Sequence, residues 1–339
     1  MDKVKVALVG CGNIGQVVHL PNLKKMPDVE LVAVCDPDAR KVKAIAEKYN
    51  VPTSFKTIDD MLSSPIGSEV QAAVICTPTD SHKPNAIAAL QAGVDILVEK
   101  PIARTAKEAQ EIVTVADKYK RKLMVGMNNR FRPDVMILKS FIENGELGKI
   151  FYIKSGWLKQ QSSAASWQRQ SDKSGGGVFL DLGIVMLDMG LWLLNYPEVK
   201  SVSGTAYYQN TKKVEDSCAV FIRLANDVTL TIESSWTFHR DGDFFYNNVF
   251  GDSGSAFINP LRVFKSVAGN LVNLTPAKSE SQVGLYKKSY ENELRQFINS
   301  VKGVVPLVSS GHEAVQRMKV VDAYYQSAAK GKEIVISKK

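Results

Sequence analysis

Cysteine and histidine are scarce in this chain of 339 residues, with four of each. No Cys-x-x-Cys pair occurs among the cysteines, which are Cys11, Cys35, Cys76 and Cys218. Their spacing argues against a disulfide framework and against a zinc site. No two histidines have metal-ligand spacing, and no Gly-x-Ser-x-Gly turn occurs, so neither a metal site nor a serine hydrolase is predicted.

Long apolar runs are also missing, and runs of one charge are rare. Residues 1–3 lead directly into a strand without a basic-then-apolar signal segment, and no apolar run is long enough to cross a bilayer. We therefore expect a cytoplasmic protein without a membrane partner. The net charge is +8, but basic residues are interleaved with acids except at 119–122, so no nucleic-acid partner is expected. The excess positive charge suits solubility and anionic substrates.

A length of 339 residues with 45% hydrophobic content predicts two domains, each with its own core. In the first third of the chain, apolar strands alternate with amphipathic helices. The expected strands are 4–9, 29–35, 53–55, 72–76, 96–98 and 123–125, and the helices between them include 39–49, 82–92 and 106–119. This alternation predicts a parallel sheet covered on both faces, with functional residues at the carboxyl ends of its strands.

The pattern changes after about residue 133. Apolar and polar residues then alternate with period two, at 151–155, 218–223 and 228–233, which predicts an antiparallel sheet with one covered face. Helices are expected at 135–144, 290–301 and 311–329. We therefore predict an α/β domain over 1–125 and an α+β domain over 126–339.

A glycine pattern joins the first expected strand to the helix that follows. It reads Gly10-Cys11-Gly12-Asn13-Ile14-Gly15. The first glycine permits a tight turn, the second lets a pyrophosphate approach the backbone, and the third lets helix and strand pack closely. Free amides at the helix start, including those of Asn13 and Ile14, then face the phosphates. With its flanking strand and helix, the pattern predicts a dinucleotide site.

An acid at the expected spacing strengthens this prediction. Asp36 ends the second apolar strand, about twenty residues beyond the last glycine. A carboxylate there pairs with the ribose 2′-hydroxyl and repels a 2′-phosphate, which favours NAD. Arg40 and Lys41 follow closely, and either could swing to a phosphate, so NADP stays an alternative.

Two further strand ends carry Thr77-Pro78 and Glu99-Lys100-Pro101. Lysine is rarely buried without a partner, so Lys100 stands in an unusual place. Beside a bound nicotinamide cation the ammonium form is disfavoured, and the amine can then act as a base. The alternative is a lysine that only pairs with Glu99 or with a helix end.

Five segments together resemble the Gfo/Idh/MocA oxidoreductases. They are GCGNIG (10–15), CTPTDSH (76–82), AGVDILVEKPIA (92–103), GMNNRF (126–131) and SGGGVFLDLGIVMLD (174–188), and they cover nearly the whole chain in the family's order. The resemblance implies a Rossmann domain over 1–125 and a substrate-binding domain over 126–339 with a large open mixed, mostly antiparallel sheet. It also implies homodimers or homotetramers built through that sheet.

The resemblance also implies roles for single residues. Lys100 would lie near both nicotinamide and substrate. Beyond the glycine loop and Asp36, the implied cofactor-binding residues are Thr77, Pro78, His82, Glu99, Lys100 and Asn128. For His82, a structural role as a helix cap stays open.

One departure from the family pattern concerns catalysis. The family's second motif usually reads D-x-G-x-H-x-x-D, and Val185 stands where the histidine is common. On an α-helix Asp181 and position 185 share a face, so a histidine there could exchange a proton while Asp181 oriented it. Three interpretations stay open. Lys100 acts alone or with Asp181, another group replaces the histidine, or the chain binds its cofactor without turnover.

Several residues of the second domain are candidate substrate contacts: Lys100 is joined in this role by Arg130, Trp167, Arg169, Asp181 and Val185. An arginine fork suits a carboxylate or phosphate, and an indole suits a sugar face, although the tryptophan could instead pack beneath a loop. The glycines at 175–177 suggest a backbone brought close to cofactor or substrate. Among the other histidines, His239 is a possible substrate contact, His19 is expected to pack or face solvent, and His312 is expected to cap a helix.

The leading prediction is an NAD(P)-dependent oxidoreductase. It moves a hydride between nicotinamide and a hydroxyl or carbonyl carbon of a sugar, cyclitol or sugar derivative, with Lys100 and Asp181 as catalytic residues and no metal. Two alternatives remain. One is a catalytically silent dinucleotide-binding regulator, and the other is a reductase of a non-sugar ligand, similar to dihydrodiol dehydrogenase or biliverdin reductase.

Overall fold

The computed structural model describes residues 3–162, 164–239, 241–277 and 280–336. The chain folds into two compact units. The first consists of Met1–Met127 together with Tyr290–Val315, and the second of Asn128–Ser289 together with Gln316–Lys339. The first unit therefore takes in a late segment of the chain that the sequence-based division at 125 had grouped with the second domain.

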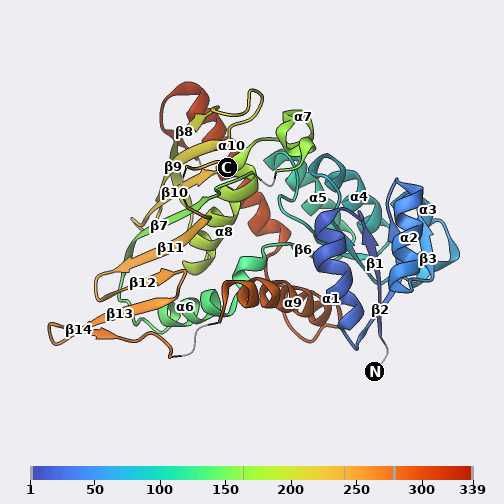
Figure 1. Ribbon diagram of the computed structural model, residues 1–339, viewed down its shortest axis with the longest axis horizontal. Helices are drawn as coiled ribbons and strands as arrows, with labels where there is room; N and C mark the ends of the chain where they lie inside the picture. The colour runs from blue at the N-terminus through green and yellow to red at the C-terminus, as the bar shows by residue number, and fades with distance from the viewer. Residues whose placement is uncertain (1–2, 163, 240, 278–279, 337–339) are drawn as a thin grey trace. The chain divides into compact units, whose positions relative to one another are not determined.

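The first unit contains a parallel sheet of six strands in the order β3-β2-β1-β4-β5-β6 (Figure 1). The strands are β1 (Val4–Val9), β2 (Val29–Cys35), β3 (Thr53–Phe55), β4 (Ala72–Ile75), β5 (Asp95–Val98) and β6 (Leu123–Val125). The central strands are almost wholly buried, as their uninterrupted apolar sequences require. The predicted parallel sheet is confirmed, and its order reverses direction between β1 and β4.

Helical segments connect these strands. A π-helical turn, η1 (Gly15–His19), runs into α1 (Leu20–Lys25), and the others are α2 (Ala39–Tyr49), α3 (Ile58–Leu62), η2 (Pro65–Glu69), α4 (Thr79–Gln91) and α5 (Ala106–Lys118). Side chains cap the starts of three of them, with Thr57 accepting the Asp60 amide at α3. Asp38 accepts the amides of Arg40 and Lys41 at α2, and Thr105 accepts an amide at α5. Gly93, at φ 83°, ends α4 in the left-handed region, as expected from the sequence.

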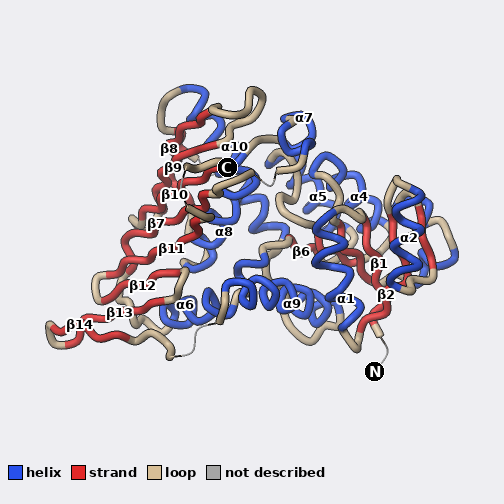
Figure 2. Tube along the Cα trace, in the orientation of Figure 1, coloured by secondary structure: helices blue, strands red, loops and turns tan. Residues whose placement is uncertain are grey.

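The second unit contains a mixed sheet of nine strands, seen side by side in Figure 2. They are β7 (Ile150–Leu158), β8 (Val199–Tyr207), β9 (Ser217–Leu224), β10 (Thr229–Ser235), β11 (Phe244–Gly251), β12 (Gly254–Ile258), β13 (Arg262–Val267), β14 (Asn270–Asn273) and β15 (Ile334–Val335). Their order is β14-β13-β12-β11-β7-β10-β9-β8-β15, and of these neighbours only β7 and β10 run parallel. The predicted mixed, mostly antiparallel sheet is confirmed.

Helices cover one face of the nine-stranded sheet. The helical segments after residue 127 are η3 (Asn128–Phe131), α6 (Pro133–Glu143), η4 (Ser166–Arg169), α7 (Ser171–Ser174), η5 (Phe179–Gly183), α8 (Ile184–Leu193), α9 (Gln282–Val301) and α10 (Gly311–Lys330). Of these, α8 packs on β7 and β10, and η5 on β10. Alternate residues of β9, such as Cys218, Val220 and Ile222, point into this core.

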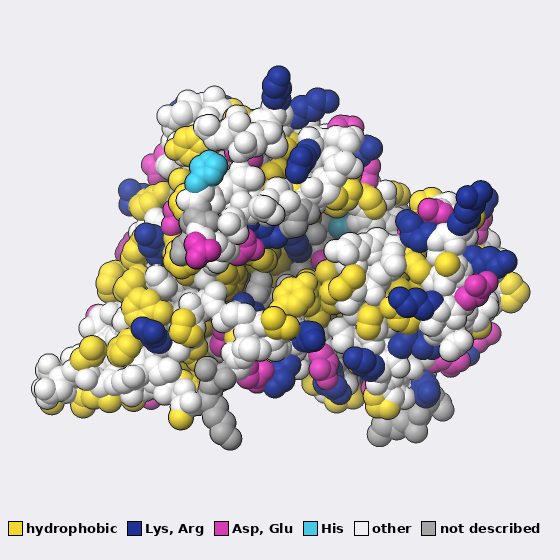
Figure 3. All heavy atoms as spheres, viewed as in Figure 1, with side chains coloured by type: hydrophobic (Ala, Val, Ile, Leu, Met, Phe, Trp, Pro, Cys, Tyr) yellow, Lys and Arg dark blue, Asp and Glu magenta, His cyan; other side chains and the backbone are white. Residues whose placement is uncertain are grey.

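One helical stretch qualifies the expectation about membrane-length apolar runs. Ser171–Leu193 is long and apolar enough to span a bilayer, yet 89% of its most apolar window is buried inside the protein. A core helix has the same composition, because it is apolar all round. On the face of the molecule in Figure 3, basic side chains are scattered among acidic and neutral ones rather than gathered into one patch.

Candidate functional site

The residues predicted to bind the dinucleotide gather at one edge of the six-stranded sheet. Gly10 follows β1, Asp36 follows β2, Thr77 follows β4 and Lys100 follows β5. Backbone hydrogen bonds join these strand ends, for example from the Gly10 amide to the Cys35 carbonyl at 2.8 Å. The edge spans the point where the strand order reverses, which is where open parallel sheets bind ligands.

The three fingerprint glycines occupy three different environments. Gly10 has φ +95°, and a Cβ atom on it would lie 2.7 Å from the Cys76 carbonyl carbon. A Cβ on Gly15 would lie 2.5 Å from the Gly10 carbonyl oxygen. A Cβ on Gly12 would meet no protein atom within 4 Å. The outer two glycines thus let the backbone pack closely, whereas Gly12 faces open space where a pyrophosphate fits.

The Asp36 carboxylate is held by the loops around it. Its Oδ2 accepts the Cys11 amide at 2.9 Å, and its Oδ1 accepts the Asp38 amide and the Lys41 ammonium, each at 3.0 Å. The side chain of Asp36 is 7% exposed and that of Lys41 38%. The carboxylate is therefore fixed beside the glycine loop, and the more exposed ammonium of Lys41 pairs with it.

His19 has a role that the sequence did not reveal. Of the two expected places, packed or facing solvent, the packed one is correct: His19 is fully buried, and its Nε2 lies 2.7 Å from Oε1 of Glu99. Its ring lies perpendicular to that of Tyr290, with the two centroids 5.9 Å apart. The other carboxylate oxygen of Glu99 accepts the Lys100 amide at 3.1 Å. His19 thus positions the Glu99 carboxylate, and Glu99 in turn fixes the Lys100 backbone. No spacing in the sequence signals this pairing, because His19 and Glu99 lie 80 residues apart.

The pKa of Glu99 reflects two opposing influences. Burial alone would raise it, since the charged form is disfavoured away from water. The hydrogen bond and charge of His19, the Lys100 charge and the Lys100 amide outweigh burial and lower the pKa. Glu99 is therefore a carboxylate at neutral pH and presents negative charge next to Lys100.

His82 links two loops at the same edge instead of capping a helix. Helix α4 begins with Pro78 as its N-cap, without a side-chain cap. The Nδ1 and Nε2 atoms of His82 lie 2.8 Å from the carbonyl oxygens of Pro101 and Thr77. Burial lowers its pKa, and the neutral ring can donate to only one of these carbonyls at a time. The helix-cap alternative is wrong, and His82 instead ties the two loops that carry Thr77 and Lys100.

In the second unit, Asp181 lies on a π-helical turn. Residues Phe179–Gly183 form η5, and Val185 lies in the α-helix that continues from it, 4% exposed. The α-helical spacing assumed for Asp181 and Val185 is therefore interrupted by the wider turn. Oδ2 of Asp181 accepts the indole N–H of Trp236 at 2.9 Å. Sequence reasoning did not single out Trp236.

The glycines before Asp181 make close approaches within the protein. Cβ atoms on Gly176 and Gly177 would collide with the Tyr325 hydroxyl and the Glu215 carbonyl oxygen. The Glu215 carboxylate accepts the amides of Gly177 and Phe179 at 3.0 and 2.9 Å and the Tyr325 hydroxyl at 3.0 Å. These contacts, and not an approach to a ligand, account for Gly176 and Gly177. Burial raises the pKa of Glu215 despite these donors.

The predicted substrate contact of Arg130 needs correction. Its guanidinium is 1% exposed and forks onto Asp188 at 2.8 and 2.6 Å. Arg317 and Tyr196 also donate to Asp188, at 2.6 and 2.5 Å. Burial would raise the pKa of Asp188, but the two arginines lower it. The fork of Arg130 is filled by the chain's own carboxylate, so Arg130 stabilises the second unit instead of meeting a ligand.

The remaining predicted residues occupy varied places. Asn128 donates to the Ser289 hydroxyl at 2.9 Å. Trp167 is half-buried and Arg169 exposed, both on η4, and their substrate roles stay predictions. His239 is exposed in the segment after β10.

His312 does not cap α10, contrary to expectation. Its Nε2 lies 3.2 Å from Asp117, whereas Ser310 and Glu313 form reciprocal hydrogen bonds at the start of the helix. The four cysteines are buried free thiols, and burial raises the pKa of Cys11 and of Cys35 to about 12. Within the described ranges, no group of three His, Cys, Asp or Glu side chains could hold a metal ion.

Comparison with known proteins identifies both halves of the chain. Residues 4–127 match the model of an oxidoreductase family with an NAD-binding Rossmann fold, and residues 139–336 match that family's C-terminal alpha/beta domain. The chain belongs to the Gfo/Idh/MocA oxidoreductase family. This confirms the resemblance inferred from the five sequence segments.

Curated relatives of this Gfo/Idh/MocA protein match over nearly their full length. D-glucoside 3-dehydrogenase of Escherichia coli (strain K12) is 27% identical, with 98% of this chain and 97% of the relative covered. Inositol 2-dehydrogenase of Rhizobium meliloti (strain 1021) is 29% identical, with 98% and 99% covered.

Solved structures share the fold. Levoglucosan dehydrogenase in complex with NADH and L-sorbose matches with a TM-score of 0.89 at 21% identity, covering 100% of both chains. GenD2 from gentamicin A biosynthesis, in complex with NAD, matches with a TM-score of 0.87 at 24% identity, covering 100% of this chain and 97% of that one. At these identities the likeness establishes the architecture alone.

Proposed function

We propose that this Gfo/Idh/MocA protein is an NAD(P)-dependent dehydrogenase acting on a hydroxyl or carbonyl carbon of a sugar, cyclitol or sugar derivative. The observation that carries the proposal is the sheet edge at which the open backbone at Gly12, the fixed carboxylate of Asp36 and Lys100 follow the carboxyl ends of β1, β2 and β5. The glucoside and inositol dehydrogenases among its relatives support the substrate class.

The first unit supplies the residues that would hold the cofactor. The Gly12 backbone and the amides at the start of the helix would hold the pyrophosphate, and Asp36 the ribose. When bound, the nicotinamide supplies the position that accepts or donates the hydride. Because Lys41 already pairs with Asp36, a 2′-phosphate would have to compete with that carboxylate for the ammonium. This favours NAD over NADP.

Lys100 would transfer the proton that accompanies the hydride. In the oxidation direction its neutral amine accepts the proton of the substrate hydroxyl, and in the reduction direction its ammonium returns it to the carbonyl oxygen. The carboxylate of Glu99 fixes the Lys100 backbone, so that the amine starts from a defined position. Asp181, with Val185 unable to carry a proton, would bind and orient a substrate hydroxyl.

The test is the substitution Lys100→Met with an NAD⁺ reduction assay over a panel of sugars and cyclitols. We expect turnover to fall by at least about 10², the usual scale of acid–base help, with cofactor affinity retained. Lys107→Met, on the exposed surface of α5, is the matched control and should behave as the wild type. Wild-type turnover in Lys100→Met would refute the assignment of the proton to this amine.

A second candidate function is a regulator that binds the dinucleotide without turnover. It is favoured by Val185, which cannot exchange a proton as the family's usual histidine could. The intact Glu99-Lys100-Pro101 segment and its buried support from His19 argue for the enzyme. Cofactor binding measured by calorimetry, combined with no turnover on a broad panel, would decide for the regulator.

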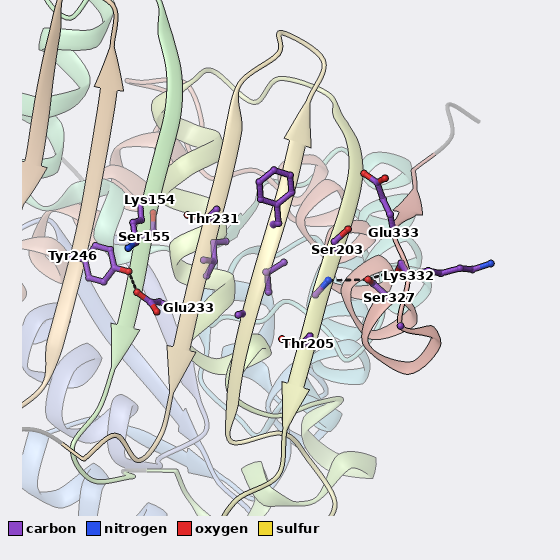
Figure 4. Close-up of a pocket in the computed structure, with 16 residues that line it drawn as sticks. Lys154, Ser155, Ser203, Thr205, Thr231, Glu233, Tyr246, Ser327, Lys332 and Glu333 are labelled. Carbon is purple, nitrogen blue, oxygen red and sulfur yellow. Dashed lines mark hydrogen bonds between the residues drawn. The ribbon is translucent and has the colours of Figure 1, made fainter.

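Copies of the chain would associate through the uncovered face of the nine-stranded sheet. Half-buried rings of Tyr152, Phe250, Phe257 and Phe264 form a continuous row on it, with neighbouring ring centroids 5.6, 5.9 and 6.2 Å apart. The same face has a hollow of about 550 Å³ beside the end of the chain, bordered by Glu233, whose carboxylate accepts the Tyr246 hydroxyl (Figure 4). An apolar, indented face of this kind suits a second sheet, and a monomer in sedimentation would contradict the assignment.

A further inference from the structure

A side-chain partner of Asp181 comes from the residue that follows β10. Trp236 follows that strand directly, and its indole nitrogen donates to Oδ2 of Asp181 at 2.9 Å across 55 residues of sequence. Trp236 is 2% exposed, whereas Asp181 is only half-buried. The donor is thus locked in the core and the acceptor reaches toward the surface of the second unit.

The surroundings of Trp236 leave its ring little freedom. Its backbone amide donates to the Asp216 carbonyl at 2.8 Å, and the Asp216 carboxylate in turn accepts the Asn210 and Thr211 amides. The ring is among the largest fully buried side chains of the chain. A side chain packed this tightly changes rotamer only at high cost, so the direction of its N–H is fixed by the fold.

We propose that Trp236 is a positioning residue for catalysis, which acts by holding Asp181 in the orientation that receives a substrate hydroxyl. This rests on the proposed dehydrogenase function. An indole N–H is a donor only and does not titrate, so it can orient a carboxylate without transferring a proton to it. Val185, on the helix that continues from the turn of Asp181, has no polar atom with which to do the same. In this chain the carboxylate is therefore oriented by a fixed donor just beyond the end of β10.

The proposal is tested by a double-substitution cycle with Trp236→Phe and Asp181→Ala. Phenylalanine keeps an aromatic ring but removes the N–H. We expect Trp236→Phe to lower kcat/KM about tenfold, in the range of a hydrogen bond to a charged group, with NAD⁺ affinity unchanged. In the Asp181→Ala background the same substitution should have no further effect, because the group it acts through is gone. Losses that multiply would show a packing role and overturn the proposal.

A second readout does not depend on activity. The chain has four tryptophans, so ¹⁵N labelling of the indoles gives four resolved N–H signals, and Trp236→Phe identifies the one from Trp236. In Asp181→Ala this signal should move upfield and exchange faster with solvent, while the other three stay in place. An unmoved signal would overturn the proposal.

Trp192→Phe is the matched control. It removes an indole from α8, where the ring packs against Arg130 and Lys139, and should leave both the kinetics and the Trp236 signal unchanged. A wild-type protein without turnover on any substrate would refute the proposed function. The indole signal would then still decide whether Trp236 orients Asp181.

Discussion

Two carboxylates, one in each unit, are held in comparable ways by different chemistry. Glu99 accepts from the ring of His19, 80 residues away in sequence, and Asp181 from the ring of Trp236, 55 residues away. Glu99 is buried and also holds a backbone amide, whereas Asp181 is half-buried. The first pair belongs to the framework of the sheet edge. The second leaves its acid accessible, as a residue that meets a ligand must be.

The comparison predicts that removing Glu99 mainly lowers stability, whereas removing Asp181 mainly lowers activity. Glu99→Ala leaves the buried His19 ring without its acceptor and should lower the free energy of unfolding by about 3 kcal/mol, as when one partner of a buried pair is removed. Asp181→Ala should lower it by less than about 1 kcal/mol, since its site is accessible to water. Chemical denaturation of both variants, with turnover measured alongside, makes the comparison. Equal losses of stability in the two variants would contradict the different roles of Glu99 and Asp181.

Two glycines of the loop in the first unit can likewise be assigned to different roles, one to stability and one to cofactor binding. Gly15→Ala places a Cβ atom 2.5 Å from the Gly10 carbonyl oxygen and should cost about 1–3 kcal/mol of stability, as overpacking does. Gly12→Ala meets no protein atom and should change stability by less than about 0.5 kcal/mol. Its effect should fall on the cofactor instead, with NAD⁺ affinity at least about tenfold weaker by calorimetry. Wild-type NAD⁺ affinity in Gly12→Ala would contradict the assignment of the pyrophosphate to this loop.

The smallest effect concerns pH. The pKa of Glu99 in the folded protein is lowered below its value of about 4.3 in an unfolded chain, so its contribution to stability is complete above that value. The contribution is lost as the pH falls through the lower, folded pKa. Glu99→Gln should therefore flatten the decline of unfolding free energy between about pH 5 and pH 3, by on the order of 1 kcal/mol. Urea titrations across this range measure it, and parallel slopes in variant and wild type would contradict the ionised, His19-bound state.

Prediction from the sequence succeeded where the pattern was local. The strands from β1 to β6 and the mixed character of the second sheet follow from runs and alternation of apolar residues. The glycine spacing placed the tight turn at Gly10 and the close packing at Gly15, both of which the backbone confirms. These features depend on neighbours within one turn or one strand–helix unit.

Errors arose where a side chain's partner lies far away in sequence. Arg130 looked like a ligand fork, but Asp188 fills it from 58 residues away. A helix cap was one of two interpretations of His82, but it reaches the Pro101 carbonyl across 19 residues. Nothing in the spacing of His19 or Trp236 tells which acid each would meet, because that depends on which elements pack together.

By itself, the sequence determined the family, the two kinds of sheet and the edge at which a dinucleotide would bind. Each of these rests on local periodicity or on glycines whose missing side chains are needed at fixed steps along the chain. The tertiary structure alone decided which buried ring holds which acid, and that Gly12 but not Gly177 faces open space. The reason is physical: hydrogen bonding and burial are set by groups brought together from distant positions, and their distances exist only once the chain has folded.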